Sequence, residues 1–182
     1  ENAETTDLEF TNTYAPGQTS LTGSDNLKVT KTFTGRPNDE WLDTDSFEFT
    51  LAIDATDEET DAAYRNGDIV LPENTTLTVN AQNNGSASFG DITFKKAGTY
   101  QFIVTETDGG LAGVKYDTTP RTVIVNVVDN HDGTMTASLD EKSDELSFAN
   151  TYDNGGASLS GDTALKVTKS FTGRPNNEWL DS

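Results

Sequence analysis

The chain has no cysteine, few basic residues and no long hydrophobic run. The absence of cysteine excludes disulfides, so a secreted β protein of this size would need another source of stability or a well-packed core. Only 12 lysines and arginines stand against 31 aspartates and glutamates, and the net charge of −19 argues against binding to nucleic acid or anionic membranes. No apolar stretch approaches the roughly 18 residues that a membrane-spanning helix requires.

The acidic segments and the single histidine form no recognisable metal or catalytic motif. The clusters at 43–45 and 54–61 offer carboxylates of the kind that bind calcium, but neither has EF-hand spacing, and a solvated acidic face is the simpler interpretation. His131 lies in an expected turn, which is a poor position for a Ser-His-Asp site. We therefore expect no metal, no cofactor and no turnover catalysis.

The strongest organisational signal is an internal repeat. Leu-Glu-Phe-Thr-Asn-Thr-Tyr at 8–14 returns as Leu-Ser-Phe-Ala-Asn-Thr-Tyr at 146–152, and Leu-Lys-Val-Thr-Lys at 27–31 returns unchanged at 165–169. Both pairs share one offset of 138 positions, which indicates a tandem array with domain-sized units. The predicted organisation is the tail of a preceding repeat at 1–14, a linker at 15–26, a complete repeat at 27–152, a second linker at 153–164 and the start of a following repeat at 165–182.

Strand-like segments separated by turn sequences dominate the complete repeat. At least seven short strands with such spacing predict an all-β fold, an antiparallel β-sandwich of immunoglobulin type. Residues 57–65, rich in acids and alanine, are the one segment expected to form a short helix. The predicted strands are 27–34, 46–53, 68–71, 76–80, 87–94, 98–106, 121–128, 135–139 and 145–152.

Three polar residues interrupt the apolar faces of these strands. Alternation places Lys31 in line with Val29 and Phe33, because every second side chain of a strand points to the same face. The same count places Glu106 and Asn150 on the apolar faces of 98–106 and 145–152. A buried lysine, acid or amide is costly unless it is paired or reacts.

A lysine, an acid and an asparagine that meet in a dry core are the ingredients of a Lys–Asn isopeptide bond. Burial would favour the neutral amine of Lys31, which must attack the carbonyl carbon of Asn150, and the protonated acid of Glu106, which would shuttle protons. Lys28 is a rival nucleophile that alternation assigns to solvent, and Asn126 is a rival amide. An unreactive alternative stays open, in which the lysine extends its amine to solvent or pairs with the glutamate.

The spacing of these motifs resembles the streptococcal pilin isopeptide-linkage domain. The resemblance rests on Leu-Lys-Val-Thr-Lys at 27–31, Val-Thr-Glu at 104–106 and Phe-Ala-Asn-Thr at 148–151, and it extends over the complete repeat. It implies a CnaB-like sandwich in which Lys31 bonds Asn150 with Glu106 as proton shuttle. It further implies a shaft or stalk module on the surface or cell wall of a Gram-positive bacterium.

Several features leave the biological setting open. No sortase signal or pilin-type lysine motif is found, so the parent is either a polymerised pilin or a long tandem adhesin, and the near-identical repeats favour the adhesin. Asn12 and Lys169 repeat the acceptor and donor motifs without their own glutamate strand, and are candidates for crosslinks between neighbouring chains. The expected partners are adjacent repeats of the same protein, with neighbouring chains in a fibre as a further candidate. The alternative function is a ligand-binding adhesin module for a host glycan or matrix protein.

Overall fold

The computed structural model describes residues 8–155, 159, 161, 166–170 and 172–173. Its helical elements are α1 (Gly23–Asn26), a 3₁₀ turn (Pro37–Asp39) and α2 (Glu58–Arg65). None of the helices in these residues is long and apolar enough to cross a membrane. The strands are β1 (Thr19–Leu21), β2 (Lys28–Thr34), β3 (Ser46–Ile53), β4 (Ile69–Val70), β5 (Thr76–Asn80), β6 (Ser86–Ser88), β7 (Ile92–Phe94), β8 (Gly98–Glu106), β9 (Val114–Lys115), β10 (Arg121–Asp129), β11 (Met135–Leu139) and β12 (Ser147–Tyr152).

The strands form an all-β sandwich, which confirms the predicted fold class. One sheet has the order β11-β10-β8-β3-β5, the facing sheet has the order β6-β2-β12-β9, and a small third sheet has the order β1-β7-β4. Strand pairing is antiparallel except between β2 and β12, which run parallel. The first and last long strands of the domain are therefore direct neighbours, although more than a hundred residues separate them along the chain.

Alternation decides which side chains enter the core. In β2 the odd-numbered residues from Val29 to Phe33 are buried and the even-numbered ones are exposed, and β8 buries every second residue from Tyr100 to Glu106. Aromatic rings join the two large sheets, as where Phe49 of β3 packs on Phe148 of β12 with ring centroids 4.9 Å apart. This apolar packing surrounds the polar residues of the predicted site with a well-filled core.

The short helix forms where the sequence predicts it. Asp57 caps α2 by accepting a hydrogen bond from the backbone N–H of Thr60 at 2.9 Å, and three further acids occupy the first turn, where the helix dipole favours negative charge. The Thr60 hydroxyl in turn accepts from the backbone N–H of Gln101 on β8 at 2.8 Å. The helix is thereby fastened to the large sheet.

Two segments differ from the sequence-based expectations. Residues 87–94, predicted as one strand, are divided between β6 and β7, which belong to different sheets and are separated by residues 89–91, which lie in no strand. Residues 15–26, predicted as a linker, contain β1 and α1. Leu21 of β1 is buried, and β1 pairs with β7, so this stretch is part of the folded body.

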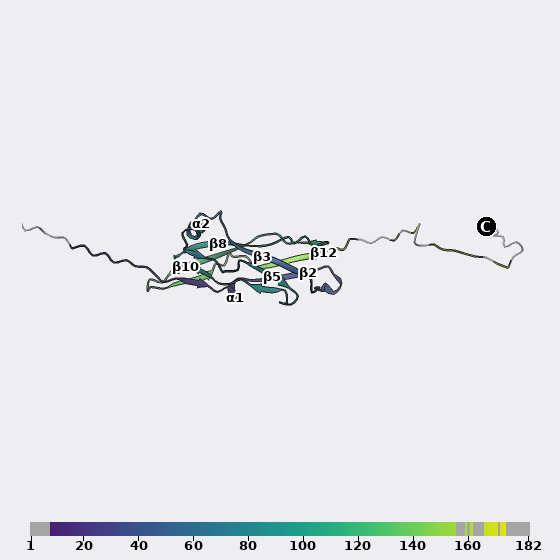
Figure 1. Cartoon of the computed structure of the whole chain (residues 1–182), viewed down its shortest axis with the longest axis horizontal. Coiled ribbons are helices and arrows are strands. Elements are labelled where there is room, and N and C mark those ends of the chain that lie inside the picture. The colour runs from purple at the N-terminus through teal and green to yellow at the C-terminus, as the bar shows by residue number, and fades with distance from the viewer. Residues whose placement is uncertain (1–7, 156–158, 160, 162–165, 171, 174–182) are drawn as a thin grey trace, which may run out of the picture.

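The chain enters and leaves the body at opposite ends. Figure 1 shows residues 8–18 leaving the sandwich beside the β10–β11 end, and residues 153–155 leaving at the far end beyond β12. The long strands run roughly along the axis between these ends (Figure 1).

Candidate functional site

Lys31, Glu106 and Asn150 meet in the core of the sandwich. One carboxylate oxygen of Glu106, Oε2, lies 2.6 Å from Nζ of Lys31, and the other, Oε1, accepts a hydrogen bond of 2.6 Å from Nδ2 of Asn150. The three residues are only 5%, 4% and 1% exposed, respectively. The carboxyl group thus bridges the two nitrogen atoms in a site without access to bulk water.

The strand arrangement explains why these side chains converge. On the parallel strands β2 and β12, Lys31 lies opposite Phe148 and Asn150 lies opposite Phe33, so the lysine and the asparagine are two positions apart on one face of one sheet. Glu106 is the last residue of β8 in the facing sheet. The donor and the acceptor are therefore neighbours in one layer, and the acid approaches them from the other.

Aromatic side chains make this site dry. Nζ of Lys31 lies 5.1 Å from the ring centroid of Phe47 and 5.8 Å from that of Phe49, both from β3. Burial lowers the pKa of Lys31 despite the attraction of the nearby glutamate, and burial raises the pKa of Glu106. Both shifts favour the neutral pair, with the proton on the acid and the lone pair on the amine.

The amide of Asn150 is held in one orientation. Its Oδ1 accepts a hydrogen bond of 2.7 Å from the backbone N–H of Asp117, while its Nδ2 donates to Glu106. Exchanging the amide oxygen and nitrogen would break both contacts. The amide N–H would then face the Asp117 N–H, and the amide oxygen would face the Glu106 carboxylate. The backbone N–H also lies where it can stabilise negative charge on that oxygen.

The segment around Asp117 is fixed to β12 by an ion pair. Arg121 donates to the Asp117 carboxylate at 2.7 Å and to the carbonyl of Ser147 at 3.0 Å, and its guanidinium lies 4.6 Å from the ring centroid of Phe148. Burial acts to raise the pKa of Asp117, but the hydrogen bonds from Ala149, Thr119 and Arg121 together lower it, so the pair is charged. This clamp sets the position of the N–H that contacts Asn150.

The rival residues lie elsewhere. Lys28 is exposed, as alternation predicts. The side chain of Asn126 is engaged outside the cluster, because its Nδ2 donates to Asp140 at 2.8 Å and its Oδ1 accepts from the Thr99 hydroxyl at 3.0 Å. Asn12 and Lys169 are both exposed and lie outside any strand or helix.

Sequence reasoning missed the contribution of Asp117. Its contact to Asn150 comes from a backbone N–H, which no residue type indicates. The aromatic enclosure by Phe47 and Phe49 was visible only as an alternating pattern within 46–53. That pattern identifies a buried face without saying which residue it covers.

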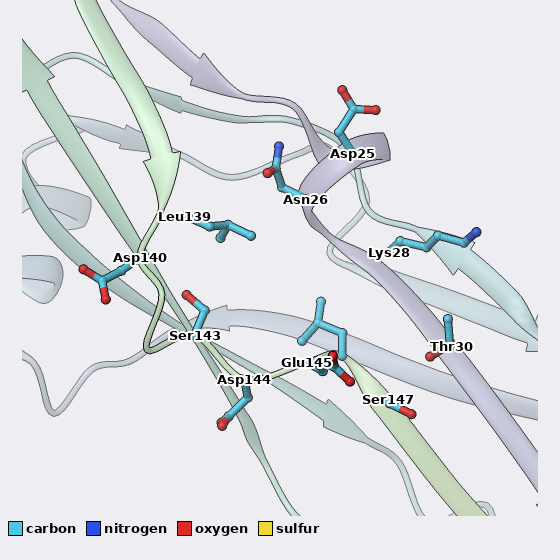
Figure 2. A pocket seen from close by; sticks show the side chains of 11 residues that line it. Asp25, Asn26, Lys28, Thr30, Leu139, Asp140, Ser143, Asp144, Glu145 and Ser147 are labelled. Carbon is cyan, nitrogen blue, oxygen red and sulfur yellow. The ribbon is translucent and has the colours of Figure 1, made fainter.

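No second site of comparable order is found in the described residues. An open hollow of about 430 Å³ lies between the start of β2 and the connection from β11 to β12. Figure 2 shows its acidic side chains, among them Asp25, Asp140 and Asp144, pointing in different directions rather than toward one point. Within the described part of the chain, no three His, Cys, Asp or Glu side chains are grouped as metal ligands.

The fold and this cluster together define a class: a β-sandwich with a buried lysine and asparagine on its first and last long strands and an acid between them. Comparison with known families agrees. Residues 27–153 match the family described as the Spy0128-like isopeptide containing domain, FctA. The chain belongs to this family.

Comparison with solved structures found similar chains. The chain is similar to the major pilin from Streptococcus pyogenes, with 21% identity, a TM-score of 0.46, and coverage of 76% of this chain and 51% of that one. A second similar structure is the major pilin protein T-13 from a Streptococcus pyogenes serotype, with 17% identity, a TM-score of 0.45, and coverage of 75% and 54%. The chain spans about half the length of these pilins. Comparison with curated proteins gave no match.

Proposed function

We propose that this chain is a stalk or shaft module of a bacterial surface fibre, and that an intramolecular isopeptide bond joins Lys31 to Asn150. The observation that carries the proposal is the position of Glu106, whose two oxygens contact the amine and the amide nitrogen at the same distance of 2.6 Å. Membership of an isopeptide-containing family supports it. Glu106 is the proposed proton shuttle.

The reaction exchanges one amide for another. Nζ of Lys31, as the neutral amine, attacks the carbonyl carbon Cγ of Asn150, and the negative charge that develops on Oδ1 is stabilised by the Asp117 N–H. Glu106 takes a proton from the attacking nitrogen through one oxygen and delivers a proton to the departing amide nitrogen. The new C–N bond forms, the old one breaks, and ammonia leaves, so the acid is regenerated after a single turnover.

The cost of burying the unreacted lysine and glutamate favours the reaction. A buried amine and acid lose the hydration of their charged forms, which costs several kcal/mol for each ion before their attraction is counted. The product amide carries no charge and needs only ordinary hydrogen bonds. Folding also holds the reacting groups together at high effective concentration, which removes the entropic part of the barrier.

The bond would give the module its mechanical role. Tension that enters β2 and leaves from β12 would cross directly from one strand to the other through the amide, and the rest of the sandwich would carry little of it. By analogy with a disulfide closing a loop of about 120 residues, the crosslink also stabilises the fold by about 5 kcal/mol. These are the properties that a stalk requires.

The proposed location is the outside of a Gram-positive cell, with adjacent repeats and neighbouring subunits of a fibre as candidate partners. The similar solved structures are major pilins, which supports assembly into a fibre. The internal repeat of this chain is compatible with either a polymerised pilin or one long adhesin that carries many such modules in series.

Intact-mass spectrometry tests the bond. The purified chain is expected to weigh about 17 Da less than its sequence mass, the loss of one ammonia, and Lys31→Ala is expected to restore the full mass. Lys28→Ala is the matched control, because this exposed lysine lies on the same strand, and its deficit should persist. A full-mass wild-type chain that is folded would disprove the crosslink.

The flanking motifs extend the same experiment. In the intact array, Asn12 and Lys169 would each react within its own repeat, and in this chain each lacks its glutamate strand. A single ammonia loss per chain is expected. A second loss, together with dimers that persist in denaturant, would show that the flanking residues join neighbouring chains.

A further inference from the structure

A hairpin at one end of the sandwich holds the segment that precedes the domain. The turn between β10 and β11 offers the carboxylate of Asp129, which is 23% exposed, beside the backbone N–H of Gly133. Tyr14 donates its hydroxyl proton to Asp129 at 2.9 Å and accepts from the Gly133 N–H at 3.2 Å. A hydroxyl is needed here, because only a group that both donates and accepts can serve both partners.

Hydrogen bonds within the turn itself hold the hairpin in shape. His131 adopts a φ of 61° and Gly133 a φ of 92°, and the His131 N–H donates to Asp129 at 2.8 Å. Asp132 accepts from the backbone N–H and the hydroxyl of Thr134. These local bonds fix the loop, so the acceptor and the donor face outward in a set arrangement.

Contacts continue from Tyr14 into the sheet. The N–H of Gly17 donates to the carbonyl of Gly133 at 2.9 Å. Both the N–H and the carbonyl of Gly133 therefore form hydrogen bonds with the preceding segment. Two residues later, Thr19 begins β1, which pairs with β7. The stretch from Tyr14 to β1 is therefore tied to the body at three successive points.

The internal repeat indicates that Tyr14 belongs to the end of the preceding repeat. Tyr14 closes the Asn-Thr-Tyr motif that returns with Tyr152 at the end of β12. Tyr152 makes its contacts through its ring, which lies 6.5 Å from the ring of Phe33 and 5.0 Å from the guanidinium carbon of Arg36. The ring of Tyr14 is exposed here, which leaves it available for the equivalent packing in its own repeat.

We infer that the Asp129–Gly133 hairpin is the docking surface for the preceding repeat, and that the motif tyrosine joins the two. Its ring packs in the repeat that ends, and its hydroxyl bonds to the hairpin of the repeat that begins. This inference rests on the proposed tandem arrangement. It makes the short connection between modules a defined joint with a preferred angle, rather than a freely swivelling linker. The position of the hairpin beside residues 8–18, at the opposite end from β12, fits such end-to-end stacking (Figure 1).

Amide hydrogen exchange measured by NMR on this chain tests the joint. Tyr14→Phe removes only the hydroxyl, and the Gly17 and Gly133 amides are then expected to exchange about fivefold faster, as for the loss of one net hydrogen bond. Tyr152→Phe is the matched control, since it makes the same change in the same motif at the far end, and it should leave both rates unchanged. Equal rates in the wild type and Tyr14→Phe, or unprotected amides in the wild type, would overturn the inference.

The same samples separate this inference from the crosslink. Their intact masses report whether ammonia has been lost, and neither tyrosine variant should alter that loss. Protected amides together with a full mass would support the joint and disprove the isopeptide bond. A mass deficit with no effect of Tyr14→Phe would do the reverse.

Discussion

Asn150 and Asn12 carry the same Asn-Thr-Tyr motif but lie in different environments. Asn150 is 1% exposed, contacts the carboxyl group of Glu106 and has its oxygen held by a backbone N–H. Asn12 is exposed, outside the sandwich. The lysines offer the same contrast, since Lys31 is enclosed by two phenylalanines whereas Lys169 is exposed.

The contrast shows that the motif alone does not make the site. An exposed lysine and an exposed amide lack the dry surroundings of the core, so the reactivity we propose comes from burial and from an acid on the facing sheet. The proposed reactive cluster requires β2, β8 and β12 together in one folded repeat.

Replacing the acid should abolish the proposed reaction. Glu106→Gln preserves the shape of the side chain but cannot exchange protons, so the chain is expected to retain its full mass after prolonged incubation. Glu48→Gln is a suitable control, because Glu48 is exposed on the neighbouring strand β3. An ammonia loss that survives in folded Glu106→Gln would show that the acid is not the shuttle.

Truncating Asn150 and truncating Asn12 should have very different effects on the stability of the fold. Asn150→Ala is expected to lower the free energy of unfolding by about 5 kcal/mol, because the crosslink closes a long loop. Asn12→Ala should change it by less than about 0.5 kcal/mol, as is usual for an exposed residue. Urea unfolding followed by circular dichroism measures both.

Packing losses must be subtracted from that comparison. Adding Asn150→Ala to the unreacted Glu106→Gln background gives the cost of truncation without any crosslink. If this cost equals the effect of Asn150→Ala alone, the bond contributes no stability.

The rate of the reaction should depend on pH with a maximum. Burial lowers the pKa of Lys31 and raises the pKa of Glu106, and the reactive form holds one proton between them. At low pH a second proton blocks the amine, and at high pH the acid is lost, so the rate should fall about tenfold per pH unit on each flank. The two flanks should lie closer together than the ordinary values of about 4.3 for glutamate and about 10.4 for lysine.

The measurement requires chain that is unreacted at the start. Protein recovered unfolded from inclusion bodies and diluted from urea into buffers of different pH can be sampled by mass spectrometry over time. Circular dichroism at each pH shows whether the chain has folded. A rate independent of pH across the folded range would contradict the proton shuttle.

The clamp on Asp117 should have the smallest effect. Arg121→Ala removes the ion pair that fixes the N–H beside Asn150, and we expect the reaction to slow by about tenfold, which is less than the roughly hundredfold or larger cost of removing such a donor altogether. Arg65→Ala is the matched control, since Arg65 pairs with Asp61 at the same i, i+4 spacing on the surface of α2. Equal rates in the two variants would assign the clamp no part in positioning.

Much of the architecture was predictable from alternation. The burial of Lys31, Glu106 and Asn150 follows directly from counting every second residue along each strand. Several strands, including 46–53 and 98–106, begin and end as predicted. Alternation works here because each sheet has one face against the core.

Other features had no local signal. β1 is short and polar, so it resembles a linker, and it is a strand only because β7 offers it an edge. The division of 87–94 depends on which sheet each half joins. The N–H of Asp117 is positioned by β9, β10 and Arg121 together, which is information held by the tertiary structure rather than by neighbouring residues.

The proposed crosslink between the paired strands β2 and β12 has a consequence for the length of a filament under tension. A comparable domain without a crosslink would release about 120 residues when pulled open, or about 400 Å of slack at roughly 3.4 Å per residue. With an amide between Lys31 and Asn150, almost none of that chain can extend. A filament of such modules would keep a nearly constant contour length under load, so a cell tethered by it would be held at a fixed distance.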